Sequence, residues 1–207
     1  MINSRVNEIF PTPIYRTTLT QDFSKKQLSF IDKIKAHDCQ SPPGGNLISS
    51  DKNMLEKDIF KNIKQELDLI IQDYFEKIIS PSNNITPYIT QSWLNYMGPN
   101  QQCHTHTHSN SYVSGILYVK CHETLDKIKF YNEDYHAIEP CIKNHNLFNS
   151  DSWVFPVKTK DVVMFPSSLT HGVDTTEGDD TRISLVFNVF IKGTLGTYSS
   201  ATELILK

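Results

Sequence analysis

The chain has 207 residues and a mass of 23.7 kDa, and 38% of its residues are hydrophobic. This length suits one domain, and the composition is too apolar for a disordered protein. The 20 basic and 23 acidic residues give a formal net charge of −3. There is therefore no overall positive field that would hold a nucleic acid.

Nothing in the sequence points to a membrane or to secretion. It contains no apolar run long enough to span a bilayer, and its first residues lack the basic-then-apolar layout of a signal peptide. The four cysteines form no CxxC pair and are too few for a disulfide scaffold. We therefore expect a cytoplasmic protein with reduced thiols, and the oligomeric state stays open, a homo-oligomer included.

The N-terminal part, about residues 1–84, is predicted to be helical. Apolar residues recur at helical spacing over 22–37 and again over 53–79, and charged residues fill the opposite faces. The turn-forming segment SPPGGN at 41–46 separates the two helices, and SPSNN at 80–84 ends the second. Both apolar stripes are expected to face the core.

After residue 85 the pattern changes to short segments rich in Val, Ile, Tyr and Phe, which indicates strands. No helix-length pattern lies between them, so we expect antiparallel pairing in a sandwich or jelly-roll barrel. The predicted strands are residues 88–97, 111–120, 126–132, 161–166 and 182–192. The predicted fold is thus one domain over 1–207, mainly β with N-terminal helices (α+β), with a β core at about 85–192 and a tail at 193–207.

Three histidines stand at alternate positions, His104, His106 and His108. In an extended chain, side chains two residues apart share a face, with Cα atoms about 6.5–7 Å apart. Two imidazoles can converge on one metal ion across that gap, so the chelating pair is either His104 with His106 or His106 with His108. The same pattern also fits a solvated, histidine-rich edge, and imidazole alone does not select among Zn, Fe, Cu and Ni.

A second polar group lies near the C-terminus. His171 stands in a glycine-flanked turn. An acidic turn follows, and the strand after it begins with Arg182, one of only three arginines. Arg182, Ser184 and Asn188 share one face of that strand, and the opposite face is apolar. A guanidinium beside a hydroxyl that faces a barrel interior suits bidentate recognition of a carboxylate. The alternative is an edge-strand arginine paired with the acidic turn.

Several short motifs follow one another along the chain in a specific order and spacing. They are FPTPIY at 10–15, WLN at 93–95, HTH at 106–108 with SGILY at 114–118, and FPSSLTHGV at 165–173 with RISLVFN at 182–188. Together they resemble the 2-oxoglutarate/Fe(II)-dependent oxygenases, and more closely the branch of these enzymes found in marine bacteria and their phages. The resemblance covers nearly the whole chain, although the helical part matches only in type.

The resemblance implies a fold, a reaction and a site. The fold would be a double-stranded β-helix, a cupin-like jelly roll with the metal in its mouth. The reaction would be hydroxylation of a substrate that the sequence does not identify, with succinate and CO₂ as co-products. At the matching positions His106, His108 and His171 would hold Fe(II), and Arg182 with Ser184 would hold the far carboxylate of the cosubstrate 2-oxoglutarate.

One position departs from the family pattern. The usual triad is His, a carboxylate two residues on and a distal His, but position 108 is histidine. Either three histidines bind the iron, or His106 and His171 bind it with water or another carboxylate in the third place. The downstream candidates, among which spacing does not select, are Glu123, Asp126, Glu133 and Asp134.

Further residues are expected near this site. Asn95 and Tyr118 lie on predicted strands with one face toward the interior, where they would touch 2-oxoglutarate or substrate or only satisfy a polar core. His104 and Asn188 are candidates for an outer shell around the metal. The segment 134–153 is long for a loop in a compact domain, and we expect it to cover the site.

Two functions remain open from sequence. The first is the oxygenase, acting on a small molecule or a protein side chain, with no membrane partner and with nucleic acid the least favoured substrate. The alternative is a non-catalytic, cupin-like module in which the same barrel binds a metal or ligand without turnover. The first reading predicts succinate production and the second does not.

Overall fold

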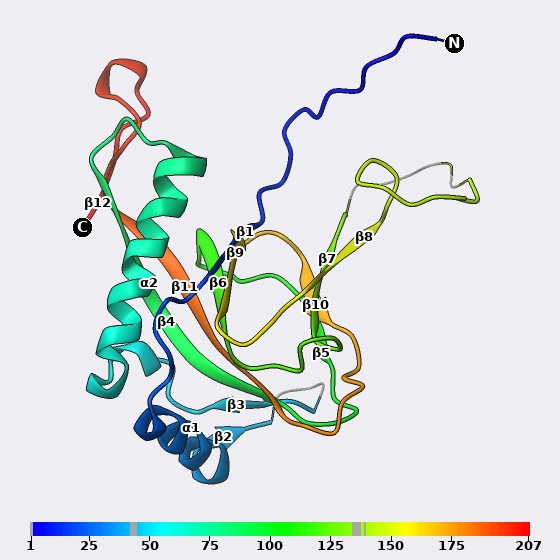
Figure 1. Cartoon of the computed structure of the whole chain (residues 1–207). Coiled ribbons are helices and arrows are strands. Elements are labelled where there is room, and N and C mark those ends of the chain that lie inside the picture. Colours follow the sequence, from blue (N-terminus) through cyan, green and yellow to red (C-terminus); the bar gives the residue numbers. More distant parts are fainter. Residues whose placement is uncertain (1, 42–44, 134–137, 139) are drawn as a thin grey trace.

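The computed structural model describes residues 2–41, 45–133, 138 and 140–207. Two antiparallel sheets face each other, and two helices cover the outer face of the larger sheet (Figure 1). Among the residues described, no helix is long and apolar enough to cross a membrane.

The larger sheet has eight strands in the order β1-β9-β6-β11-β4-β3-β2, and β12 pairs with β11. The smaller has four in the order β5-β10-β7-β8. The strands of the larger sheet are β1 (Tyr15–Thr18), β2 (Cys39–Gln40), β3 (Leu47–Ser49), β4 (Ile85–Met97), β6 (Val113–Lys120), β9 (Asp161–Pro166), β11 (Arg182–Leu195) and β12 (Leu204–Leu206). Those of the smaller are β5 (Cys103–His106), β7 (Lys127–Tyr131), β8 (Ser152–Pro156) and β10 (His171–Val173).

The chain alternates between the two sheets from β4 to β11, except at the consecutive pair β7 and β8. Strands that cross from one sheet to the other in this way form a double-stranded β-helix, a jelly roll in which both edges of the core are paired. The predicted fold class is therefore confirmed. The interior between the sheets is where alternate residues of β11 and β4 point.

The first helix, α1 (Lys25–His37), starts close to its predicted position. Ser24 caps it: the Ser24 hydroxyl accepts the Gln27 backbone N–H, and the Gln27 side chain accepts the Ser24 N–H. This reciprocal pair satisfies two donors that a helix start otherwise leaves open.

The second predicted helix, 53–79, is shorter in the structure. Its α-helical part is α2 (Lys61–Tyr74), preceded by 3₁₀ turns at Met54–Glu56 and Asp58–Phe60 and followed by a π-helical turn at Phe75–Ile79. The reason is packing, because Met54, Leu55 and Phe60 are all buried, and the Leu55 N–H donates to the Ser92 hydroxyl of β4.

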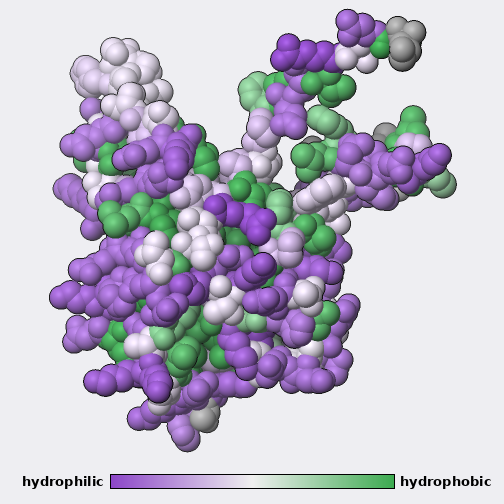
Figure 2. Space-filling view, viewed as in Figure 1, coloured by the Kyte–Doolittle hydropathy of each residue, from purple (hydrophilic) through white to green (hydrophobic). Residues whose placement is uncertain are grey.

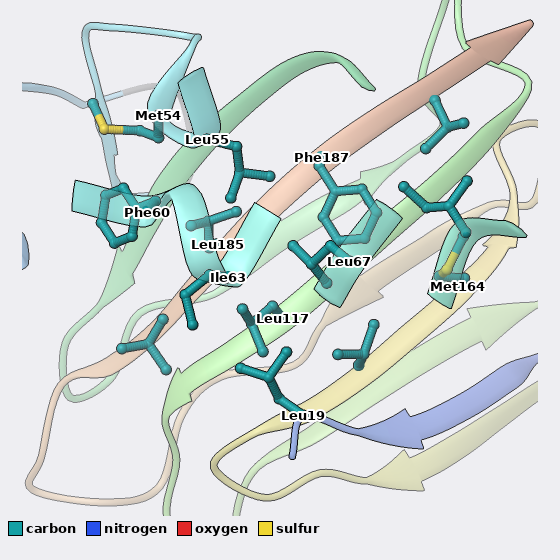
Figure 3. Close-up of a cluster of buried hydrophobic side chains, with 14 of the residues drawn as sticks. Leu19, Met54, Leu55, Phe60, Ile63, Leu67, Leu117, Met164, Leu185 and Phe187 are labelled. Atoms are coloured by element: carbon teal, nitrogen blue, oxygen red, sulfur yellow. The ribbon is translucent and has the colours of Figure 1, made fainter. Parts of the chain in front are cut away.

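The main core lies between the helices and the larger sheet. The apolar face of β11 contributes Leu185 and Phe187, and α2 contributes Ile63 and Leu67, all fully buried. Figure 3 shows these side chains meeting between α2 and the strands. The alternation predicted for this strand thus divides it into a helix-facing apolar side and a cavity-facing polar side.

The N-terminal and C-terminal parts depart from the sequence-based division. The part predicted as helical also supplies β1, β2 and β3, and the predicted tail holds β12, which pairs back on the end of β11. These strands have two to four residues, too few to show a clear period of two.

Two segments project from the compact part of the molecule, residues 2–14 before β1 and residues 140–151 before β8 (Figure 1). They carry exposed apolar side chains, among them Phe10, which is 95% exposed, Leu147 and Phe148. Figure 2 shows these green atoms on the projecting parts, whereas the compact surface is mostly polar.

Gly115 on β6 lies directly under the Phe187 ring, and a Cβ there would come within 2.1 Å of that ring. We expect Gly115→Ala to lower the free energy of unfolding by about 1–3 kcal/mol, since the ring must leave its rotamer. Urea unfolding measures this. Gly178→Ala is the control, because its Cβ would meet only Leu125 Cδ1, at 3.6 Å. Equal stability of both variants would contradict the prediction.

Candidate metal centre

A cavity of about 330 Å³ lies between the two sheets. Its wall contains His106, His108 and His171 together with Arg182 and Ser184 of β11. The polar face predicted for β11 therefore does open on the interior.

Strand pairing brings the three histidines together. His106 lies opposite His171 in the antiparallel pair of β5 and β10, and cross-strand neighbours have Cβ atoms about 5 Å apart. His108 follows the end of β5, where its backbone N–H donates to the carbonyl of Ser167. Ligand atoms of all three lie within 4.8 Å of one another. His104 is exposed at the cavity wall, with its ring 5.1 Å from that of His106, and is not part of this group.

Each of the three rings is held through its Nδ1 atom. Two of the acceptors are backbone carbonyl oxygens and one is a side-chain amide oxygen, so Nδ1 carries the proton and Nε2 keeps its lone pair. The acceptors are the carbonyl of His104 for His106 (2.7 Å), the carbonyl of Leu169 for His171 (3.0 Å) and Oδ1 of Asn188 for His108 (2.7 Å).

The partner of His108 belongs to a buried polar cluster. Asn188 lies opposite Ser114 across β11 and β6, and the Ser114 hydroxyl is 2.9 Å from Nδ1 of His108. Ser114 in turn bonds to Ser167 at 2.8 Å, and Ser167 donates to Ser111 at 2.8 Å. Asn188 thus lies where an outer-shell residue was predicted, and the sequence analysis missed the three serines.

Burial lowers the pKa of all three imidazoles. The pKa of His171 falls to about 3, chiefly through desolvation and further through the nearby His106 and His108, while its bond to the Leu169 carbonyl opposes the fall. The pKa values of His106 and His108 are also lowered, again mainly by desolvation. Three neutral imidazoles with free Nε2 atoms are a donor set that fits Fe(II), as well as the other imidazole-preferring metals.

The carboxylates weighed as a third ligand lie elsewhere. Asp126 accepts a backbone N–H in the turn after β6, Glu133 accepts the Thr170 hydroxyl, and Glu123 is exposed. Asp134 lies outside the described residues. Within the part of the chain that is described, the cluster of candidate ligands contains histidine only.

Arg182 is 5% exposed and lines the same cavity. Its Nη1 donates to the Lys127 carbonyl at 2.9 Å, and its guanidinium carbon lies 5.1 Å from the centre of the Tyr118 ring. No described carboxylate is within ion-pair distance of it, and Asp180 of the acidic turn pairs with Lys120 at 3.1 Å instead. A buried guanidinium without a carboxylate partner is costly, so this cavity favours an anionic ligand.

The remaining predicted residues share one row across the larger sheet, in which Asn95, Ser184 and Tyr118 are neighbours on β4, β11 and β6. Asn95 lines the cavity and accepts a hydrogen bond from Nδ2 of Asn46 at 2.8 Å. Tyr118 is wholly buried beside Arg182 and is not part of the cavity wall; burial raises the pKa of its hydroxyl. Tyr118 therefore contacts the guanidinium rather than the space where a ligand would lie.

The sequence analysis assigned no role in the site to four further residues of the cavity wall. Asn46 and Lys52 flank β3, and Gln91 and Trp93 lie on the inward face of β4. No periodic signal in the sequence marks the first two, because β3 has only three residues. The predicted lid, 134–153, includes 134–137 and 139, which lie outside the described residues; none of its described residues lines the cavity.

Asn188 is predicted to hold His108 for metal binding. We expect Asn188→Ala to weaken Fe(II) binding about 10–100-fold, the usual effect of removing an outer-shell partner. An anaerobic titration against a competing chelator measures this affinity. Asn95→Ala, which lines the same cavity but bonds to no histidine, should leave it unchanged; equal affinities in the two variants would contradict the role.

The low pKa of His171 predicts a pH dependence of stability in the metal-free protein. The unfolded chain takes up a proton as pH falls through about 6.5, whereas folded His171 stays neutral down to about 3. Stability is therefore lost as pH falls between these values, by up to about 1.4 kcal/mol per unit. His171→Gln should flatten the stability profile between pH 7 and 4.5 in chemical denaturation. Parallel profiles would contradict the shift.

Comparison with protein families gives one match. Residues 91–188 match the family model described as "Putative 2OG-Fe(II) oxygenase", and this range contains all three histidines, Arg182 and Asn188. A search of curated proteins found no match.

Solved structures share the fold at low sequence identity. A Pseudomonas putida prolyl-4-hydroxylase has 11% identity and a TM-score of 0.57, with 86% of this chain and 92% of that chain covered. HygX from Streptomyces hygroscopicus, with nickel, 2-oxoglutarate and hygromycin B bound, has 13% identity, a TM-score of 0.56 and coverage of 86% and 82%. A Trichoplax adhaerens prolyl hydroxylase, in complex with a hypoxia inducible factor peptide fragment, has 11% identity, a TM-score of 0.60 and coverage of 86% and 83%.

These structures establish the likeness in fold. The family match covers the segment of the chain that carries the candidate site. The motifs at 93–95, 106–108, 114–118, 165–173 and 182–188 all fall within that segment. Residues 91–188, the part of the chain that carries the candidate site, thus match the family of 2OG-Fe(II) oxygenases.

Proposed function

We propose that the protein is an Fe(II)- and 2-oxoglutarate-dependent hydroxylase in which His106, His108 and His171 are the metal ligands. One observation carries the proposal: three neutral imidazoles and the unpaired, buried guanidinium of Arg182 line one cavity in the fold of this family. HygX, a protein of the same fold, has nickel and 2-oxoglutarate bound, which supports the same pair of ligands here.

The metal and cosubstrate supply the oxidation itself: with O₂ they hydroxylate a C–H bond, and 2-oxoglutarate is converted to succinate and CO₂. The chain's part is to bind and orient. The Nδ1 hydrogen bonds fix each ring with Nε2 toward the cavity, and because the imidazoles are neutral, no proton has to leave when a metal binds near neutral pH.

Arg182 and Ser184 are proposed to hold the distal carboxylate of 2-oxoglutarate. The planar guanidinium offers a two-point contact, and the Lys127 carbonyl and the Tyr118 ring hold it in place without neutralising it. Asn95 is a neighbour of Ser184 on the cavity wall and is proposed as a further polar contact. Ile116, Ile128 and Val186 line the same space, which would limit the access of water to it.

The primary substrate is proposed to be a small molecule or a protein side chain, the two kinds named for structures of this fold. The proposed location is the cytoplasm, where the four cysteines, all free in the structure, would stay reduced.

An anaerobic titration with Fe(II) and then 2-oxoglutarate tests the function. In the wild type we expect the weak visible charge-transfer band of the chelate, and in Arg182→Ala a half-saturating 2-oxoglutarate concentration at least tenfold higher, since a charge-assisted bond is worth about 1.5–3 kcal/mol. Arg16→Ala removes the same charge from the exposed face of β1 and should behave as the wild type.

His171→Ala should give neither the band nor Fe(II)-dependent succinate production. A wild type that binds metal or ligand but forms no succinate under any tested condition would favour the non-catalytic binding module. An unaltered 2-oxoglutarate affinity in Arg182→Ala would remove Arg182 from its proposed role.

A further inference from the structure

We infer that the primary substrate is a small organic anion whose carboxylate or phosphate group is bound by Lys52. This inference rests on the proposed function and names the substrate class of the same cavity. Its basis is the position of Lys52, the absence of a carboxylate partner for it among the described residues, and the charge of the cavity.

Lys52 lies in the cavity wall just after β3. Its backbone carbonyl accepts the Ser92 N–H of β4 at 2.7 Å, and its ammonium group donates to the carbonyl of Ser49. These two contacts hold a half-buried lysine beside β3 and β4, where it forms part of the cavity wall.

The ammonium group of Lys52 has no carboxylate within ion-pair distance among the described residues. The nearest acidic residue in sequence, Asp51, pairs with Lys57 at 2.5 Å and is thereby occupied. Lys64 and Lys160, which are half-buried as well, do have carboxylate partners. Lys52 is therefore, beside Arg182, a second cation of this cavity with no ion pair among the described residues. Burial lowers the pKa of its ammonium group, and the nearby Cys39, Asp51 and Asp38 oppose that fall.

The backbones of Lys52 and Arg182 lie beside different parts of β4. Arg182 lies opposite Met97 at one end of β4, whereas the Lys52 backbone bonds to Ser92, five residues away. At about 3.3 Å per residue these two backbone positions are roughly 16 Å apart along the strand. His108 lies on the Lys52 side, since its ring is 5.7 Å from that of Trp93. The Lys52 backbone thus lies beside the part of β4 that is near His108, and the Arg182 backbone lies beside its end at Met97.

Charge balance then favours an anionic substrate. The described cavity wall contains no Asp or Glu. A divalent metal and doubly charged 2-oxoglutarate neutralise each other, so Arg182 and Lys52 leave the loaded cavity with two positive charges. A site with the usual ligand carboxylate would have one positive charge fewer. In a partly desolvated space this field attracts an oxyanion.

The test uses Trp93 as a reporter, because it lines the cavity and the only other tryptophan is Trp153. In a Trp153→Phe background the protein is loaded anaerobically with Ni(II) and saturating 2-oxoglutarate, which occupies Arg182. Acetate and inorganic phosphate are then titrated separately at constant ionic strength. We expect saturable fluorescence changes, and the probe with the lower Kd identifies carboxylate or phosphate as the group recognised.

Lys52→Gln should raise that Kd at least about tenfold, and Lys52→Arg should restore it to within a few-fold of the wild type. Lys61→Gln, which removes the same charge from an exposed position on α2, is the matched control and should change nothing. Thermal unfolding of each variant verifies that it is folded.

Other results would overturn the inference. No saturable change with either anion, or an unchanged Kd in Lys52→Gln, would remove the oxyanion site. A Lys52→Gln variant that binds 2-oxoglutarate more weakly would instead make Lys52 part of the cosubstrate site. The Fe(II) chelate band of the wild type is measured independently of all these titrations, so its failure would count against the proposed function and not against Lys52.

Discussion

The antiparallel pairing of β5 with β10 is the contact on which the site depends. It places His106 opposite His171, although the two are 65 positions apart in the chain, and so turns two weak sequence signals into one cluster of ligands. His108 joins them because its backbone N–H, just after the end of β5, donates to the carbonyl of Ser167. Both strands are short, and the His171 ring packs against Phe130 of β7 and Phe165 of β9, which belong to an apolar cluster between the two sheets.

The alternation along β11 connects that packing to the chemistry. One face of the strand supplies Leu185 and Phe187 to the core beneath α2, and the other supplies Arg182 and Asn188 to the cavity. A slip of one residue in its register would exchange the two faces. The same pairing that stabilises the fold thus also orients the guanidinium and a metal ligand's partner.

The periodicity of long elements made much of this predictable. The jelly roll, the cavity-facing side of β11 and the group of His106, His108 and His171 all follow from spacing or from motif order. The position of Tyr118 behind Arg182, and the roles of Asn46 and Lys52 in the cavity wall, were not predictable. They depend on a strand bulge and on a three-residue strand, and such local features of tertiary packing leave no period in the sequence.

The hydrogen bonds of the serine cluster beside His108 all run in one direction. Ser111 donates to the Val113 carbonyl and Ser167 donates to Ser111, so Ser114 must donate to Ser167. The Ser114 oxygen is then left with only lone pairs to offer His108, which keeps the ring proton on Nδ1. The row of three hydroxyl groups that ends at the Val113 carbonyl therefore acts together with Oδ1 of Asn188 to keep Nε2 of His108 available.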